Sequence, residues 1–181
     1  MKKIILITAL TGLFSLALTA NQGLISAQSP QIAQTQGAII PVEKAGLGKI
    51  RPGMSEQQVR RILGKPTSTK TEFSPGVGDN IRTLQYPNIS LYLVPYVNKP
   101  KNLFFVYYFV TRSSKFLTPT GVKVGDTQSQ VIKAYGKPYI SKEGNVTFLV
   151  YGVGSSDSAA ALTFSIEAGK VTEIQYSEQL L

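Results

Sequence analysis

Hydrophobic and polar positions follow two similar series along the chain, and each series begins with a short helical pattern. Residues 50–66 align without a gap on residues 122–138, at an offset of 72 residues. The positions that are identical in the two segments are Gly53/Gly125, Gln58/Gln130, Val59/Val131, Gly64/Gly136, Lys65/Lys137 and Pro66/Pro138. Self-similarity at a fixed offset predicts that the same local structure forms twice.

Each aligned segment predicts one short helix. Ser55 and Thr127 are N-cap residues, and a glutamine three residues after each of them completes a capping box. Apolar residues then recur at helical spacing, which are Val59, Ile62 and Leu63 in the first segment and Val131, Ala134 and Tyr135 in the second. A glycine ends each pattern, and a proline two residues later prevents its continuation.

Runs of β-branched and aromatic residues follow each helix, and Pro, Gly, Asn and Ser separate them, which predicts strands. These strands are expected near residues 67–73, 81–86, 89–95 and 102–111, and again near 139–142, 146–152, 160–167 and 170–177. The predicted fold class is α+β, with two tandem repeats, each a short helix followed by a three- to four-stranded antiparallel meander. Since one helix over so few strands buries little surface, the copies are expected to share an interface or one continuous sheet.

The first 27 residues differ from the rest of the chain. Lys2 and Lys3 precede an uncharged apolar run from Ile4 to Ala20, a pattern typical of a secretory signal peptide. Cleavage is expected after Ala20 or after Ala27, and a retained membrane anchor is the alternative. The expected organisation is a signal peptide at 1–27, a flexible polar linker at 28–45, a first repeat at 46–117 and a second repeat at 118–181.

The net charge of the chain indicates which classes of partner it favours. The chain has 19 basic and 10 acidic residues, and removal of Lys2 and Lys3 with the leader leaves 17 basic residues and a net charge of +7. This excess favours anionic surfaces, so weak contact with an anionic membrane surface or glycan is expected. Nucleic acid is not expected as a partner, because export separates the chain from it and the basic residues are scattered along the sequence.

The sequence contains no histidine and no cysteine. The usual general base, thiol nucleophile and nitrogen or sulfur metal ligands are therefore missing, and the ten carboxylates are spread singly. We expect no catalytic, metal or cofactor site, and the chain is not expected to be an enzyme. Without a cysteine to carry a lipid, the protein is expected to be periplasmic or secreted and not a lipoprotein.

Aromatic residues provide the candidate binding surface. The run from Leu103 to Val110 is apolar on both alternating faces. It predicts either a central strand, covered on one side by a helix and on the other by the second repeat or a loop, or an exposed tyrosine-rich face. The candidate protein-binding residues on strands are Tyr92, Val94, Tyr96, Tyr107, Tyr151 and Tyr176, and the loops at 95–102 and 152–159 add Lys99, Lys101 and Asp157.

The string G-M-S-E-Q-Q-V-R-R-I-L-G-K-P, from Gly53 to Pro66, resembles the signature of SmpA/OmlA (BamE-like) envelope proteins. The tandem arrangement is similar to that of β-lactamase-inhibitor-like proteins, so that the resemblance covers residues 46 to 177. In the second copy Asp126 replaces Met54 and Tyr135 replaces Leu63. The chain also lacks the lipid-anchored cysteine of the first group and the disulfides of the secreted inhibitor.

This resemblance implies a non-catalytic module that binds proteins. BamE-like members support outer-membrane barrel assembly, and inhibitor-like members block a hydrolase with the concave face of their sheet. We therefore expect a protein partner in the cell envelope or the extracellular space. A secreted inhibitor of a hydrolase and a charge-driven binder of an anionic membrane surface or glycan are the alternatives.

Overall fold

The computed structural model describes residues 37–95, 102–155 and 159–178, which belong to one compact unit, Gln34–Leu181. The predicted leader lies outside the described residues. The elements are β1 (Ile39–Ile40), the 3-10 helix η1 (Val42–Lys44), α1 (Glu56–Leu63), β2 (Ser68–Ser74), β3 (Asp79–Tyr86), β4 (Ile89–Pro95), β5 (Phe104–Thr111), α2 (Gln128–Tyr135), β6 (Tyr139–Glu143), β7 (Val146–Val153), β8 (Ala160–Glu167) and β9 (Lys170–Glu178). Both predicted helices and all the predicted strands are confirmed as local elements. None of the helices in the described residues has the length and apolar character needed to span a bilayer.

Both helices begin with the predicted capping box. The Ser55 hydroxyl accepts the Gln58 N–H at 3.3 Å, while the Ser55 N–H donates to Gln58 Oε1 at 2.8 Å. Thr127 and Gln130 make the corresponding bonds at 3.3 and 2.8 Å. A capping box satisfies backbone N–H groups that have no partner within a helix, so these short helices start at fixed residues.

The ends and faces of the helices also follow the sequence, with one exception. Gly64 and Gly136 end the helices at φ of 77° and 86°, a region that favours glycine. Val59, Val131 and Tyr135 are buried. Ile62, which was expected on the packed face of α1, is 37% exposed.

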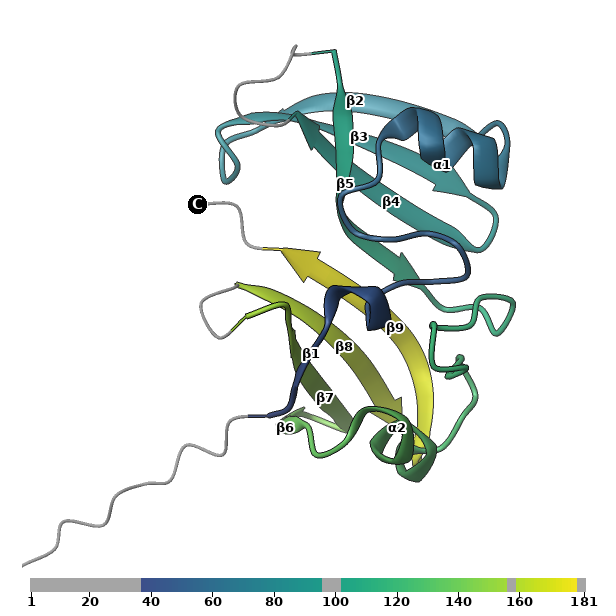
Figure 1. Cartoon of the computed structure of the whole chain (residues 1–181), viewed down its shortest axis with the longest axis vertical. Coiled ribbons are helices and arrows are strands. Elements are labelled where there is room, and N and C mark those ends of the chain that lie inside the picture. The colour runs from purple at the N-terminus through teal and green to yellow at the C-terminus, as the bar shows by residue number, and fades with distance from the viewer. Residues whose placement is uncertain (1–36, 96–101, 156–158, 179–181) are drawn as a thin grey trace, which may run out of the picture. The chain divides into compact units, whose positions relative to one another are not determined.

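The predicted fold class is wrong, because the strands form one mixed sheet with a parallel pair instead of two antiparallel meanders; one continuous sheet was among the two arrangements expected for the copies. In the described part of the chain they form one nine-stranded mixed sheet in the order β1-β7-β8-β9-β5-β4-β3-β2, and β6 also pairs with β7 (Figure 1). β1 runs parallel to β7, and the other neighbouring strands are antiparallel. Pairing between distant strands is a tertiary event that local patterns do not encode.

The two halves of the chain join through β5 and β9, the last strand of each half. Tyr108 to Thr111 pair with Ser177 to Ile174. Outside this paired stretch, each of the two strands hydrogen-bonds to the loop that precedes the helix of its own half. Val106 exchanges backbone hydrogen bonds with Gly53 and Met54 at 2.8 and 2.9 Å, and Val171 does so with Gly125 and Asp126 at 2.8 Å. The repeated sequence therefore makes the same local contact twice, while the sheet itself is continuous.

The N-terminal segment ties the halves together. In Figure 1 it runs, in dark blue, from β1 beside β7 to α1 in the other half. Leu47 and Ile50 are fully buried, and the Gly48 N–H donates to the Leu117 carbonyl at 2.6 Å. The expected flexible linker at 28–45 thus contains β1 and η1 over its described part, because apolar residues such as Ile40 (3% exposed) pack onto the core.

The hydrophobic core lies between the helices and one face of the sheet, which we call the helix face. Its members include Val59 of α1, Val131 of α2 and the inward side chains of β3, β4, β5, β7, β8 and β9. Tyr86 donates its hydroxyl to the Gly64 carbonyl at 3.1 Å, and Tyr151 donates to the Gly136 carbonyl at 3.0 Å. The end of each helix is therefore held by a buried tyrosine from a strand.

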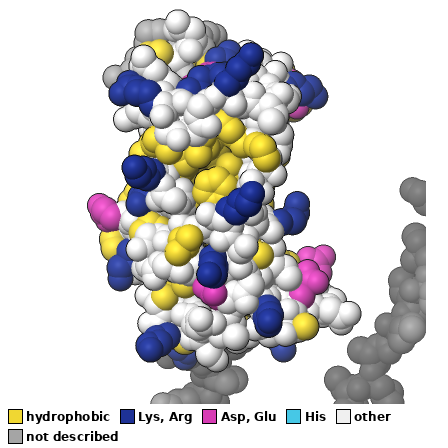
Figure 2. Space-filling model, turned by 90° about the vertical axis from the view of Figure 1, so that its right-hand side faces the viewer, with side chains coloured by type: hydrophobic (Ala, Val, Ile, Leu, Met, Phe, Trp, Pro, Cys, Tyr) yellow, Lys and Arg dark blue, Asp and Glu magenta, His cyan; other side chains and the backbone are white. Residues whose placement is uncertain are grey.

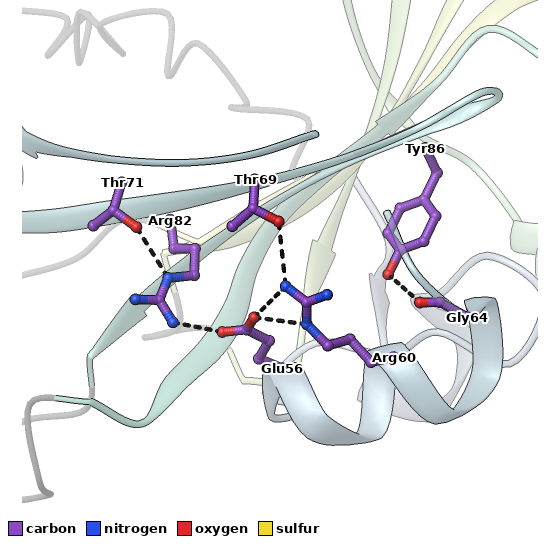
Figure 3. Close-up of polar contacts among 7 residues, drawn as sticks. All are labelled: Glu56, Arg60, Gly64, Thr69, Thr71, Arg82 and Tyr86. Atoms are coloured by element: carbon purple, nitrogen blue, oxygen red, sulfur yellow. Dashed lines mark hydrogen bonds and ion pairs between the residues drawn. The ribbon is translucent and has the colours of Figure 1, made fainter. Parts of the chain in front are cut away.

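An ionic network fastens α1 to the sheet (Figure 3). Glu56 accepts from Arg60 Nε at 2.8 Å and from Arg82 Nη1 at 2.8 Å. The Arg82 guanidinium also lies 3.9 Å from the centre of the Phe104 ring. Burial alone would raise the pKa of Glu56, but hydrogen bonds from Arg82 and Arg60 and their positive charges hold it below its usual value.

Candidate functional site

The candidate site lies on the sheet face opposite the helices, which we call the open face. Leu91 and Leu93 of β4 belong to the core. Because side chains alternate along a strand, Tyr92 and Val94 point to the open face. The predicted placement of Tyr92 and Val94 on one side of their strand agrees with this alternation. Tyr92 is partly exposed, whereas Val94 is 8% exposed.

A β-bulge determines which side chains of β5 join them. Tyr92 pairs with Tyr108, but Leu93 pairs with Val106, so Tyr107 is an extra residue on β5. Val106 and Phe109, on either side, both belong to the core. Tyr107 and Tyr108 are consequently both left outside the core and partly exposed.

Three tyrosines thus gather on the open face. The rings of Tyr92 and Tyr108 meet edge to face with centroids 4.9 Å apart, and Tyr107 lies 6.4 Å from Tyr108. We call Tyr92, Val94, Tyr107, Tyr108 and Val110 the tyrosine surface. Edge-to-face packing is a favourable geometry for aromatic rings, so the cluster holds its own shape.

The Tyr107 and Tyr108 hydroxyls stay protonated at neutral pH. Burial raises the pKa of Tyr107, and the Tyr92 hydroxyl adds to the rise. Burial also raises the pKa of Tyr108, with further contributions from Glu173 and Tyr92, although Arg112 opposes them. A neutral phenol can donate and accept one hydrogen bond while its ring supplies apolar contact, which is the chemistry of an interface anchor.

The side chains around the tyrosine surface are mostly small and polar. Thr83 of β3 pairs with Tyr92, and Ser90 of β4 pairs with Val110. Ser177 and Gln175 of β9 pair with Tyr108 and Val110, respectively. Glu173, farther along β9, forms an ion pair of 2.5 Å with Arg112. A partner would therefore meet an aromatic centre bordered by Phe105 opposite Val94, by uncharged polar groups and by one ion pair. An apolar centre with a polar rim is the arrangement typical of protein interfaces.

The other predicted site residues do not all lie on this surface. Tyr151 is fully buried on the helix face, and Tyr176, 3% exposed, stacks on Phe109 at 5.2 Å in the core. Neither tyrosine extends the tyrosine surface, because their strands turn these side chains toward the helices. Tyr96, Lys99, Lys101 and Asp157 lie outside the described residues.

Sequence reasoning missed Tyr108 and Val110. Both belong to the apolar run from Leu103 to Val110, but regular alternation from Tyr107 predicts that Tyr108 lies on the opposite face of the sheet. The second half of the chain does not cover the open face of β5. It continues the same sheet, because its strand β9 lies beside β5. β5 is a central strand with one buried face and one partly exposed face.

Part of the positive charge of the described residues is balanced by ion pairs. Figure 2 shows one side of the molecule, with lysine and arginine side chains distributed over it and hydrophobic side chains gathered in its upper half. Three arginines are engaged in ion pairs, Arg60 and Arg82 with Glu56 and Arg112 with Glu173. Among the described residues, no group of three or more carboxylates that could hold a metal ion is found.

Comparisons with known proteins agree with part of the predicted resemblance. Residues 41–77 match the family model of the outer membrane protein assembly factor BamE domain, a stretch that contains η1, α1 and β2. The resemblance to BamE-like proteins is confirmed over these residues. No curated protein sequence matches the chain significantly.

One solved structure is similar to the chain at a TM-score of 0.30 and 14% sequence identity. It is that of a Streptococcus mutans protein provisionally described as a β-lactamase inhibitor protein. The match covers 75% of this chain and 91% of that chain.

Proposed function

We propose that the chain is an exported, non-enzymatic protein that binds a protein partner of the cell envelope through the tyrosine surface. The observation that carries this proposal is the edge-to-face pair of Tyr92 and Tyr108, with Tyr107 beside it, on the partly exposed face of the sheet. The BamE-domain match at residues 41–77 supports a role in the assembly of outer-membrane or other envelope proteins.

Tyrosines are favoured in such a role because each supplies a large contact area and loses little conformational freedom on binding. The bordering threonine, serines and glutamine can supply the polar rim. The absence of histidine and cysteine from the sequence supports binding as the activity. An interface built on aromatic contacts loses little affinity as salt rises, whereas an interface built on the net charge of +7 would lose most of it.

The test uses the full chain, expressed with its leader and a C-terminal tag, to capture proteins from an envelope extract. A Tyr92→Ala/Tyr107→Ala/Tyr108→Ala variant removes the cluster, and Tyr139→Ala is the matched control because Tyr139 is 52% exposed on the edge strand β6. Loss of interface tyrosines commonly costs about 1–2 kcal/mol each, so binding of the partner should fall by about 100-fold or more. Circular dichroism checks that the variants fold.

A partner that the wild type and Tyr139→Ala capture at low and high salt, and the triple variant does not, would support the proposal. Capture that is equal in all three proteins would refute the tyrosine surface as the site. Capture that disappears at high salt, together with binding to anionic vesicles, would favour the charge-driven alternative. If the partner is a hydrolase, titration of its activity distinguishes an inhibitor from an assembly factor.

A further inference from the structure

Strand β2 forms the end of the sheet and leaves one edge of its backbone without a neighbouring strand. Among the described residues β2 pairs with β3 alone. The opposite end of the sheet is different, because the short strands β6 and β1 share the edge of β7. An unpaired edge carries a row of N–H and C=O groups that can accept another strand.

Two of the usual protections of an edge strand, a bulge and a proline, are missing from β2. It pairs with β3 from Ser68↔Gln85 to Ser74↔Asp79 without a bulge, and it contains no proline. Every side chain from Ser68 to Phe73 is exposed. Lys70, the type of residue that often blocks an edge, forms an ion pair of 2.6 Å with Glu72, so β2 carries an opposite charge beside it on the same face.

The strand is nevertheless firmly attached to its own fold. On the helix face, Arg60 Nη2 donates to the Thr69 hydroxyl at 3.2 Å, and Arg82 Nε donates to the Thr71 hydroxyl at 3.0 Å. Both arginines are anchored by Glu56 (Figure 3). β2 is therefore a preformed edge that a partner strand can join without a change of fold.

The sequence of β2 is complementary to itself. Ser68-Thr69-Lys70-Thr71-Glu72-Phe73-Ser74 has serine at both ends, threonine in the middle, and lysine and glutamate at equal distances from the centre. In an antiparallel pair centred on Thr71, Lys70 faces the partner's Glu72 and Glu72 faces the partner's Lys70. Directly opposite residues on one face lie close enough for opposite charges to attract.

We propose that β2 is a self-association edge, at which two copies of this chain pair their β2 strands antiparallel about Thr71. A two-fold axis perpendicular to the sheet makes each contact occur twice, as in other isologous dimers. The side chains of Lys70 and Glu72 alternate with those of Thr69 and Thr71, so both charge pairs form on the open face. The proposal goes beyond the proposed function and does not depend on the tyrosine surface.

A contact of one strand with one strand is small, so the dimer belongs to the weak class of protein interfaces. We therefore expect a concentration-dependent equilibrium, which sedimentation velocity and small-angle scattering of the full chain can follow from micromolar to about millimolar concentration. Reversal of one charge turns two attractive cross-strand pairs into two repulsive pairs. The dissociation constant of the dimer should then rise by at least about tenfold.

The test compares Lys70→Glu, Glu72→Lys, the double variant Lys70→Glu/Glu72→Lys, and an equimolar mixture of the two single variants. Each single variant should dimerise at least about tenfold more weakly than the wild type, whereas the double variant should dimerise as the wild type does. The mixture should also dimerise, because one chain then presents two carboxylates on β2 and the other chain presents two ammonium groups at the positions directly opposite them.

Recovery in the mixture distinguishes pairing between chains from the ion pair within one chain, which the mixture cannot restore. Both side chains are well exposed, at 68% and 55%, so the variants are expected to fold, and circular dichroism checks this. A wild type that stays monomeric over the whole range would overturn the proposal. So would a dimer that persists unchanged in both single variants, because it would use another surface.

Discussion

The replacement Glu56→Gln tests whether the ionic network fixes α1 to the sheet. The Glu56 carboxylate lies 2.7 Å from Arg60 Nη2 and 2.8 Å from Arg82 Nη1, and its side chain is only 18% exposed. Glutamine has nearly the same size but no charge. The variant therefore keeps the packing and leaves two guanidinium groups, 36% and 27% exposed, without their counter-ion.

The expected loss of stability lies between two known limits. Breaking a fully buried ion pair by removing one partner costs about 3–5 kcal/mol, and an exposed pair contributes about 0–1 kcal/mol. Since all three groups keep some contact with solvent, we expect Glu56→Gln to lower the free energy of unfolding by about 2 kcal/mol. Glu72→Gln is the matched control, because it removes a carboxylate from an ion pair with side chains 68% and 55% exposed. That change should cost less than about 0.5 kcal/mol.

Urea unfolding followed by circular dichroism measures both variants at pH 7 and again at lower pH. The folded-state pKa of Glu56 is below its ordinary value of 4.5, so its stabilising contribution is present above that value and is lost as the pH falls through the lowered pKa. The gap between wild type and Glu56→Gln should therefore close in acid. Equal losses in Glu56→Gln and Glu72→Gln at pH 7, or a gap that does not change with pH, would refute the reasoning.

Two further predictions concern elements that hold the fold. Burial, with a contribution from Tyr135, raises the pKa of Tyr151 to about 12, so the free energy of unfolding should decline as the pH rises from the ordinary pKa of 10 toward 12. Tyr151→Phe should flatten this decline, measured by urea unfolding at pH 9 and pH 11. An unchanged slope would contradict this. Ser55→Ala and Thr127→Ala should each cost about 1 kcal/mol, measured by thermal unfolding, because each removes the acceptor of an N-cap bond. Loss in only one variant would show that the two caps are not equivalent.

Part of the candidate site could be predicted from sequence. Alternation along β4 placed Tyr92 and Val94 on the same side, and the apolar run of β5 marked Tyr107. The rest depended on contacts between distant strands. The bulge opposite Tyr92 turns Tyr108 to the open face, and the core takes up Tyr151 and Tyr176. A tyrosine pattern by itself does not tell which face of a sheet the helices cover.

The sequence alone determined the local elements, because their signals act over a few residues. The capping boxes at Ser55 and Thr127 fix the helix starts, and the glycines at 64 and 136 fix their ends. The tertiary structure alone decided that β5 and β9 join the halves into one sheet and that β1 runs parallel to β7. Any strand with a free edge offers the same backbone groups, so which strands pair within the fold depends on how the whole core is buried, and a strand's own side chains then favour one register over another.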